Sequence, residues 1–155
     1  MLESKIVSRF LSIIFGLIIA FSSLSSSNSA MAAISINNRL EPCPSSPNCV
    51  VSVNGDEEHI IDPIAYQGDR ATAKETLLKV LSVVPRTEVI DSTDNYIHAE
   101  STSRIFKFVD DVEFYFPEDE NVIHLRSASR VGESDLGVNR RRMEQIRLAM
   151  QDLGV

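Results

Sequence analysis

Arginine is concentrated near the C-terminal end of an otherwise acidic chain. Five arginines lie between positions 126 and 142, and the last three are consecutive at the start of a predicted helix. The N-terminus of a helix carries partial positive charge, which disfavours each added cation by about 0.3–1 kcal/mol. We therefore expect negative charge opposite this turn. Its candidate ligand-binding residues are Arg126, Ser127, Ser129, Arg130, Asn139, Arg140 and Arg141.

The negative charge has two sources that the sequence leaves open. One is internal, because carboxylates of the chain commonly form exposed ion pairs with arginines. The other is a small anionic ligand, a carboxylate or a phosphate, held by guanidinium and backbone N–H groups. The candidate supporting carboxylates are Asp110, Asp111, Glu113 and Asp135.

Catalytic and metal-binding patterns are weak. The segment 132–137 is one residue too long for the G-x-S-x-G turn of a nucleophilic serine. The histidines, His59, His98 and His124, are scattered along the chain, and two of them without a third ligand make no persuasive zinc site. We expect neither a metal nor a cofactor.

The N-terminal residues have the pattern of a cleavable signal peptide, residues 1–32. A basic start precedes the apolar run 10–21, which is shorter than the roughly 20 residues of a membrane-spanning helix. Cleavage before Ala33 is expected, with cleavage after Ala30 or an uncleaved anchor as alternatives. Residues 33–40 read as a flexible leader. This pattern predicts an exported protein with no stable membrane anchor after cleavage, in the periplasm, or in the thylakoid lumen if the source is a cyanobacterium.

The charge balance limits the partners. The chain carries a formal charge of −7, and removal of residues 1–32 leaves 13 basic and 21 acidic residues, a charge of −8. Nucleic acids and anionic membranes require positive surface, so broad binding to either is disfavoured. The expected partner is an unknown protein or a small anionic ligand.

Two cysteines lie in a proline-rich loop of the domain, residues 41–155. Cys43 and Cys49 are separated by five residues, and prolines favour a compact turn between them. An exported protein meets conditions in which disulfides persist. We predict a structural Cys43–Cys49 disulfide, since the spacing differs from the C-x-x-C of redox sites and no histidine lies nearby for a metal.

Hydrophobic periodicity predicts two helices and about five strands. A helix is expected over 69–84, with Thr72 and Glu75 as a capping box, and a second over 139–153. The expected strands are 59–63, 87–91, 95–101, 104–116 as one bent strand or two, and 122–129.

The order of these elements is strand, helix, four strands, helix. Sequential strands with short turns imply an antiparallel sheet, and two helices can cover one face of it. The predicted class is α+β, with an arrangement similar to the TATA-binding-protein-like fold. That fold says little about function.

Three separated motifs resemble the domain of unknown function family 1499. They are the cysteine loop 43–52, the strand segment 108–114, and the arginine-rich segment 126–142, where 126–132 and 135–142 carry the match. Val51 departs from the pattern, which more often has serine there. The resemblance covers the chain from about Leu40 onward and implies a family of bacteria and photosynthetic organisms with no established activity. It also implies that the motifs belong together. We therefore expect one surface on which Asp110, Asp111 and Glu113 pair with some of Arg126, Arg130, Arg140 and Arg141.

The leading hypothesis is a non-catalytic exported module that binds a protein partner or a small anionic ligand through the arginine-rich turn. One alternative is a hydrolase-like enzyme that uses Asp110, Asp111 or Ser134 beside the arginines. It requires a pocket in which such a group converges on them. Another alternative is an assembly factor for a membrane complex.

Overall fold

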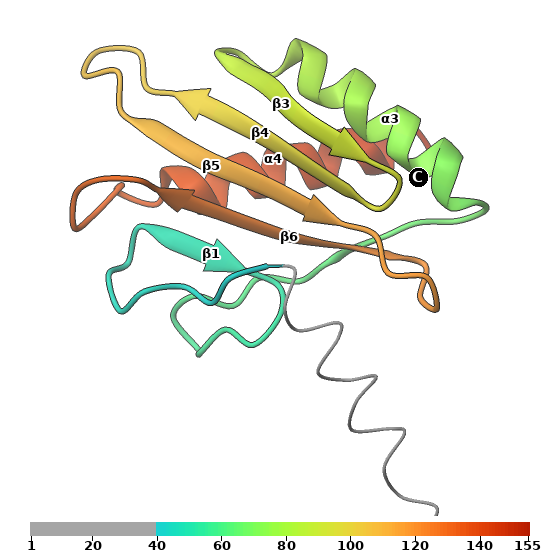
Figure 1. The fold of residues 1–155 in the computed structure, drawn as a ribbon, viewed down its shortest axis with the longest axis horizontal. Coiled ribbons are helices and arrows are strands. Elements are labelled where there is room, and N and C mark those ends of the chain that lie inside the picture. Colours follow the sequence, from blue (N-terminus) through green and yellow to red (C-terminus); the bar gives the residue numbers. More distant parts are fainter. Residues whose placement is uncertain (1–39) are drawn as a thin grey trace, which may run out of the picture. The chain divides into compact units, whose positions relative to one another are not determined.

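A computed structural model describes residues 40–155, which fold as an α+β domain with one antiparallel sheet of six strands and two helices (Figure 1). The predicted signal peptide (1–32) and all of the predicted leader except Leu40 lie outside the described residues. The elements, in chain order, are β1 (Cys49–Val51), β2 (Ile64–Ala65), α3 (Arg70–Val83), β3 (Thr87–Thr93), β4 (Tyr96–Thr102), β5 (Val109–Tyr115), β6 (Val122–Ser129) and α4 (Val138–Asp152).

The strands are arranged in the order β1-β6-β5-β4-β3, and β2 also pairs with β6. Four sequential strands therefore form a meander, and the two short strands lie along the outer edge of β6. The predicted first strand, 59–63, is wrong: Ile60 makes only an isolated bridge to Val51, and the chain pairs at Ile64 instead. Pro63 has no backbone N–H for a ladder, which explains why regular pairing begins after it.

Both helices pack on the same face of the sheet, as predicted. Alternate residues of the central strands point to this face, among them Ile97, Val112, Phe114 and Leu125, all fully buried. They pack in one core with residues of both helices: Ala73, Leu77, Val80, Leu81, Met143, Ile146 and Met150. The core, the strand pairing and the disulfide all lie within residues 40–155, so this segment is a self-contained folding unit.

The N-terminus of α3 differs from the prediction. Asp69 is the N-cap, and its carboxylate accepts hydrogen bonds from the backbone N–H (2.9 Å) and hydroxyl (2.8 Å) of Thr72. The predicted Thr72–Glu75 capping box is therefore wrong, because the helix begins one turn earlier than that motif requires.

The β4–β5 connection also differs from the prediction. The expected strand 104–116 begins only at Val109, and residues 103–108 form a loop that leaves Phe106 and Phe108 exposed. β3 continues to Thr93, two residues beyond its expected end, so the β3–β4 turn lies at Asp94 and Asn95, whereas β6 has the predicted bounds.

The Cys43–Cys49 disulfide is present. It holds residues 43–48 beside β1, and Leu40, the last residue of the predicted leader, is buried in a small second cluster with Val51 and Tyr115. Among the described residues, neither helix is long and apolar enough to cross a membrane.

Candidate functional site

The arginine-rich segment does not form one surface. Its first part is strand β6, in which alternate side chains point to opposite faces of the sheet. Arg126 lies on the open face, whereas Ser127 is buried on the face covered by the helices. The same alternation in β5 places Asp110 on the helix side and Asp111 and Glu113 on the open side. The expectation of a single surface is thus corrected, since the strand period divides the charged residues into two groups.

On the open face, Arg126 and Glu113 form a half-buried ion pair. The Arg126 Nη1 donates to Glu113 Oε2 at 2.7 Å, and the Tyr96 hydroxyl donates to Glu113 Oε1 at 2.6 Å. Burial, together with this hydrogen bond to an anion, raises the pKa of Tyr96. The carboxylate oxygens are both engaged, so this pair orders the β4–β5–β6 surface.

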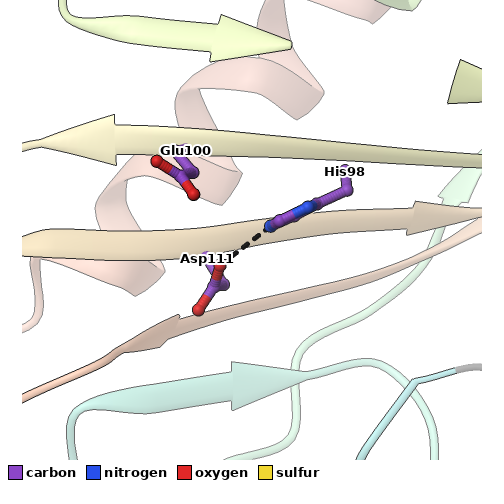
Figure 2. Close-up of side chains that lie close together, drawn as sticks. All are labelled: His98, Glu100 and Asp111. Atoms are coloured by element: carbon purple, nitrogen blue, oxygen red, sulfur yellow. Dashed lines mark hydrogen bonds and ion pairs between the residues drawn. The ribbon is translucent and has the colours of Figure 1, made fainter. Parts of the chain in front are cut away.

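A second cluster lies farther along the open face (Figure 2). Arg130 binds both oxygens of Asp111, at 3.0 and 2.8 Å, and also contacts Glu100. The His98 ring nitrogen Nε2 lies 2.8 Å from Asp111 Oδ1. Figure 2 shows how the side chains of His98 and Glu100, from β4, and Asp111, from β5, lie close together. The guanidinium of Arg130, assisted by His98, holds the pKa of Asp111 below its usual value. Asp111 thus pairs with Arg130 and Glu113 with Arg126, whereas Asp110 pairs with Arg142, which was not among the arginines expected to meet these carboxylates.

The same three side chains have the donor set of a divalent cation site. One ligand atom each from His98, Glu100 and Asp111 lies within 4.8 Å of the others. Arg130, however, already pairs with both carboxylates. A cation there would have to displace this guanidinium, so the arrangement is foremost an ion-pair network.

On the helix face, Arg142 and Asp110 form the centre of a buried polar network. Arg142 donates to Asp110 Oδ2 at 2.6 Å, to Asn139 Oδ1 at 2.7 Å and to Ser127 Oγ at 3.0 Å. Asn139 in turn donates to Ser129 Oγ and to the Asn48 carbonyl, at 3.1 and 3.0 Å. A buried ion pair is tolerated when its remaining donors are satisfied in this way. Ser127, Ser129 and Asn139 therefore bind protein groups and position Arg142.

Two features explain how α4 begins with three arginines. The Asp135 carboxylate accepts from the backbone N–H of Gly137 (2.9 Å) and of Asn139 (2.6 Å), placing a negative charge at the positive end of the helix. Gly137 has φ +74° and allows the tight entry into the helix. Arg140 turns away from the other arginines and donates to the carbonyls of Glu58 and Ile60.

A cavity of about 360 Å³ opens at one end of the helix face. It lies between the C-terminal end of β4, the first residues of β5, the start of α4 and the α3–β3 connection. Four arginines and a single carboxylate line it, together with three hydroxyl side chains and Gln145. Its charged lining residues are Arg86, Arg104, Arg141, Arg142 and Asp110.

The arginines of the cavity differ in how fully they are engaged. Arg142 is committed to Asp110. Arg86 and Arg141 are exposed and donate to backbone carbonyls, of Thr102 (3.1 Å) and Leu136 (2.8 Å). Arg104 makes no hydrogen bond or ion pair within residues 40–155. The cavity therefore holds more guanidinium donors than protein acceptors.

Of the predicted site residues, only Arg141 and the supporting Asp110 line this cavity. Arg142 stood in the same run of the sequence, but no local signal pointed to Arg86 or Arg104. Ser134 lies in the exposed β6–α4 loop, where its Oγ accepts from the backbone N–H of Leu136, and it does not line the cavity.

Comparison with known proteins agrees with the resemblance of the three motifs. A family model described as "Protein of unknown function (DUF1499)" matches residues 39–150. A search of curated proteins found no match. The matched range contains the disulfide loop, every strand of the sheet, the carboxylates on both faces of β5 and the residues that line the arginine cavity. The chain therefore belongs to the DUF1499 family.

Proposed function

We propose that this protein is a non-catalytic module that binds a small anion, a phosphate or a carboxylate, in the arginine cavity. The observation that carries the proposal is the charge of the lining: four arginines and one aspartate line one cavity, in a domain that is acidic as a whole. Arginine forks bind phosphate and carboxylate with two parallel hydrogen bonds, which gives both affinity and orientation.

The other lining groups suit the same class of ligand. Ser101, Thr102 and Ser103 add hydroxyl groups at the end of β4, and Val84 and Val138 supply an apolar wall. Small-molecule sites range from about 300 to 1,000 Å³, so this cavity fits a small ligand. The carboxylate of Asp110 is already paired with Arg142, and Asp111 and Ser134 lie elsewhere, which favours binding over hydrolysis.

The proposal includes export. The signal-peptide pattern of residues 1–32 and the Cys43–Cys49 disulfide both fit an oxidising compartment, and the periplasm is the proposed location. The likeness of the fold to the TATA-binding-protein-like arrangement is part of the same proposal and carries no function by itself.

The test is calorimetric titration of residues 33–155 with inorganic phosphate and with citrate. Wild-type protein should bind at least one of them, and the double variant Arg104→Ala, Arg141→Ala should bind at least tenfold more weakly, about 1.4 kcal/mol. These two arginines are exposed and make at most one bond to the protein, so their removal leaves the fold intact.

Lys79→Ala is a control for charge outside the cavity, to be compared with each single variant, Arg104→Ala and Arg141→Ala, because each removes one positive charge. Lys79 is exposed on α3 and does not line the cavity, so this variant should bind like wild type. Equal loss in Lys79→Ala would mean that net charge, not the cavity, attracts the anion. No binding of either probe to the wild-type protein would refute the proposed function.

A further inference from the structure

The β4–β5 loop presents large apolar side chains to solvent. Ile105 is 77% exposed, Phe106 72% and Phe108 50%. Contiguous exposed apolar side chains mark contacts with a protein or a membrane. This loop connects directly to the cavity, since Ser103 and Arg104 belong to both.

The loop is held in this conformation. The backbone N–H of Ser103 donates to the Phe108 carbonyl at 2.8 Å, and the N–H of Phe108 donates to Ser103 Oγ at 2.9 Å. The rings of Phe106 and Phe108 stack with their centroids 5.5 Å apart. The apolar tip is thus preformed, so little ordering is needed when it meets a partner.

Other exposed apolar residues lie at the same end of the sheet. Because the strands are antiparallel, the end of β6 lies beside the start of β5, and the Arg130 N–H donates to the Val109 carbonyl. The β6–α4 loop begins there and carries Leu136, which is 85% exposed, and Val131. Figure 1 shows both loops at the left end of the sheet, where α3 also ends.

Basic residues surround this apolar end. Lys107 lies within the loop, and Arg86, Arg104 and Arg141 line the cavity behind it. Two acidic residues of the β6–α4 loop oppose them, Glu133 and Asp135, and Asp135 is engaged in capping α4. The domain as a whole is acidic, so positive charge is concentrated at this end. The other faces would be repelled by an anionic surface, and only this end would be attracted to it.

We propose that this end docks on an anionic lipid membrane, with Ile105 and Phe106 inserted at the interface and a lipid phosphate bound by the arginine cavity. The inference rests on the proposed anion site for its second part. Apolar side chains flanked by Lys and Arg match the layering of a membrane, which is apolar below and anionic at its surface. We choose a membrane over a protein partner because the cationic side chains next to the apolar tip, Arg104 and Lys107, complement the anionic headgroup layer above the apolar interior.

The experiment is flotation of residues 33–155 with vesicles of phosphatidylcholine alone and with about one third phosphatidylglycerol. The anionic vesicles should bind wild-type protein at least tenfold better than the neutral ones, and added salt should weaken this binding. Ile105→Ser with Phe106→Ser should lose at least tenfold in vesicle affinity and keep its binding of inorganic phosphate. Arg104→Ala with Arg141→Ala should lose at least tenfold in affinity both for the vesicles and for inorganic phosphate.

Leu148→Ser with Leu153→Ser is the matched control. These leucines are similarly exposed but lie far from the start of α4. Leu148 is ten residues into the helix and Leu153 is its C-cap, fifteen residues after the start, which places them roughly 15–22 Å along the helix axis. This variant should bind vesicles like wild type. The chain contains no tryptophan, so Phe106→Trp provides a single tryptophan, whose emission should shift to the blue with anionic vesicles.

The outcomes separate the two proposals. Phosphate binding without vesicle binding refutes membrane docking, leaves the cavity proposal standing and assigns the apolar end to a protein partner. Vesicle binding that persists in Ile105→Ser, Phe106→Ser also refutes docking by this loop. Vesicle binding without any phosphate binding refutes the cavity proposal and the headgroup assignment together.

Discussion

His59 shows how one buried side chain connects two loops. Only 3% of it is exposed, and its ring nitrogens lie 2.6 Å from Asp56 Oδ1 and 3.2 Å from the Ser46 carbonyl. Both partners are acceptors, so the doubly protonated ring satisfies them best. The hydrogen bond to Asp56 raises the pKa of His59, and the same bond lowers the pKa of Asp56. The pair holds the disulfide loop against the turn after β1.

This pair predicts a pH dependence of stability. A base with a raised pKa contributes fully below its unfolded pKa, near 6.5, and loses its contribution as the pH rises through the folded value. Asp56 contributes above its unfolded pKa, near 3.8. The stability difference between wild type and His59→Gln should therefore be larger at about pH 5.5 than at about pH 8.5, as measured by urea unfolding.

A difference measurement is needed because His124 has the opposite effect. Burial lowers the pKa of His124, so its contribution falls as the pH drops below the unfolded value. Wild type and His59→Gln both retain His124, so its contribution to the free energy of unfolding cancels in the difference. A difference that is constant or grows with pH would show that His59 is neutral in the fold.

At the scale of the element, β5 places neighbouring carboxylates in different environments. Asp110 is buried against Arg142 among the helices, whereas Asp111 lies on the open face and is partly exposed beside Arg130. Removing one partner of a buried pair leaves an uncompensated buried charge, and exposed pairs are screened by solvent.

Two adjacent substitutions test this asymmetry. Asp110→Asn should lower the free energy of unfolding by about 3 kcal/mol, because Arg142 then lacks its anion. Asp111→Asn changes the same chemical group one residue later and should cost clearly less. Urea unfolding at neutral pH measures both. Equal losses would contradict the assignment of Asp110 to the interior.

At the scale of the whole molecule, the disulfide loop and the proposed binding region lie at the same end of the sheet. The disulfide loop and β1 cover the outer edge of β6, which leaves less of that edge free to pair with another chain. β1 pairs with the C-terminal end of β6, and the Asn48 amide donates to the Gly132 carbonyl of the β6–α4 loop. The disulfide loop therefore lies at the end of the sheet that also carries the apolar loop and the cavity, and it supports the region that we propose for recognition.

The disulfide should contribute to the stability of the entire domain. Closing so short a loop restricts the unfolded chain by about 2 kcal/mol. Cys43→Ala with Cys49→Ala should therefore lower the free energy of unfolding by about that amount. A reductant should produce a similar loss in wild type and none in the variant. An unchanged midpoint in both cases would mean that β1 is held by its strand pairing alone.

Local patterns in the sequence predicted much of the fold. The helices α3 and α4, the strand β6 and the disulfide followed from residue type and spacing. The errors arose where a local pattern had a competing local explanation. Phe106 and Phe108 have the alternate spacing of a strand, but they stack on each other in a loop. Asp69 and Thr72 are both residues that can cap a helix, and Asp69 is the N-cap of α3.

The sequence by itself determined the class of fold, its disulfide and the concentration of arginine, because each depends on residues close together in the chain. Only the tertiary structure decided which arginines share a site. Arg86, Arg104 and Arg142 lie on three separate segments and meet because antiparallel pairing brings the α3–β3, β4–β5 and β6–α4 connections to one end of the sheet. Strand register and helix placement are set by burial of the common core, and no local pattern in the sequence contains them.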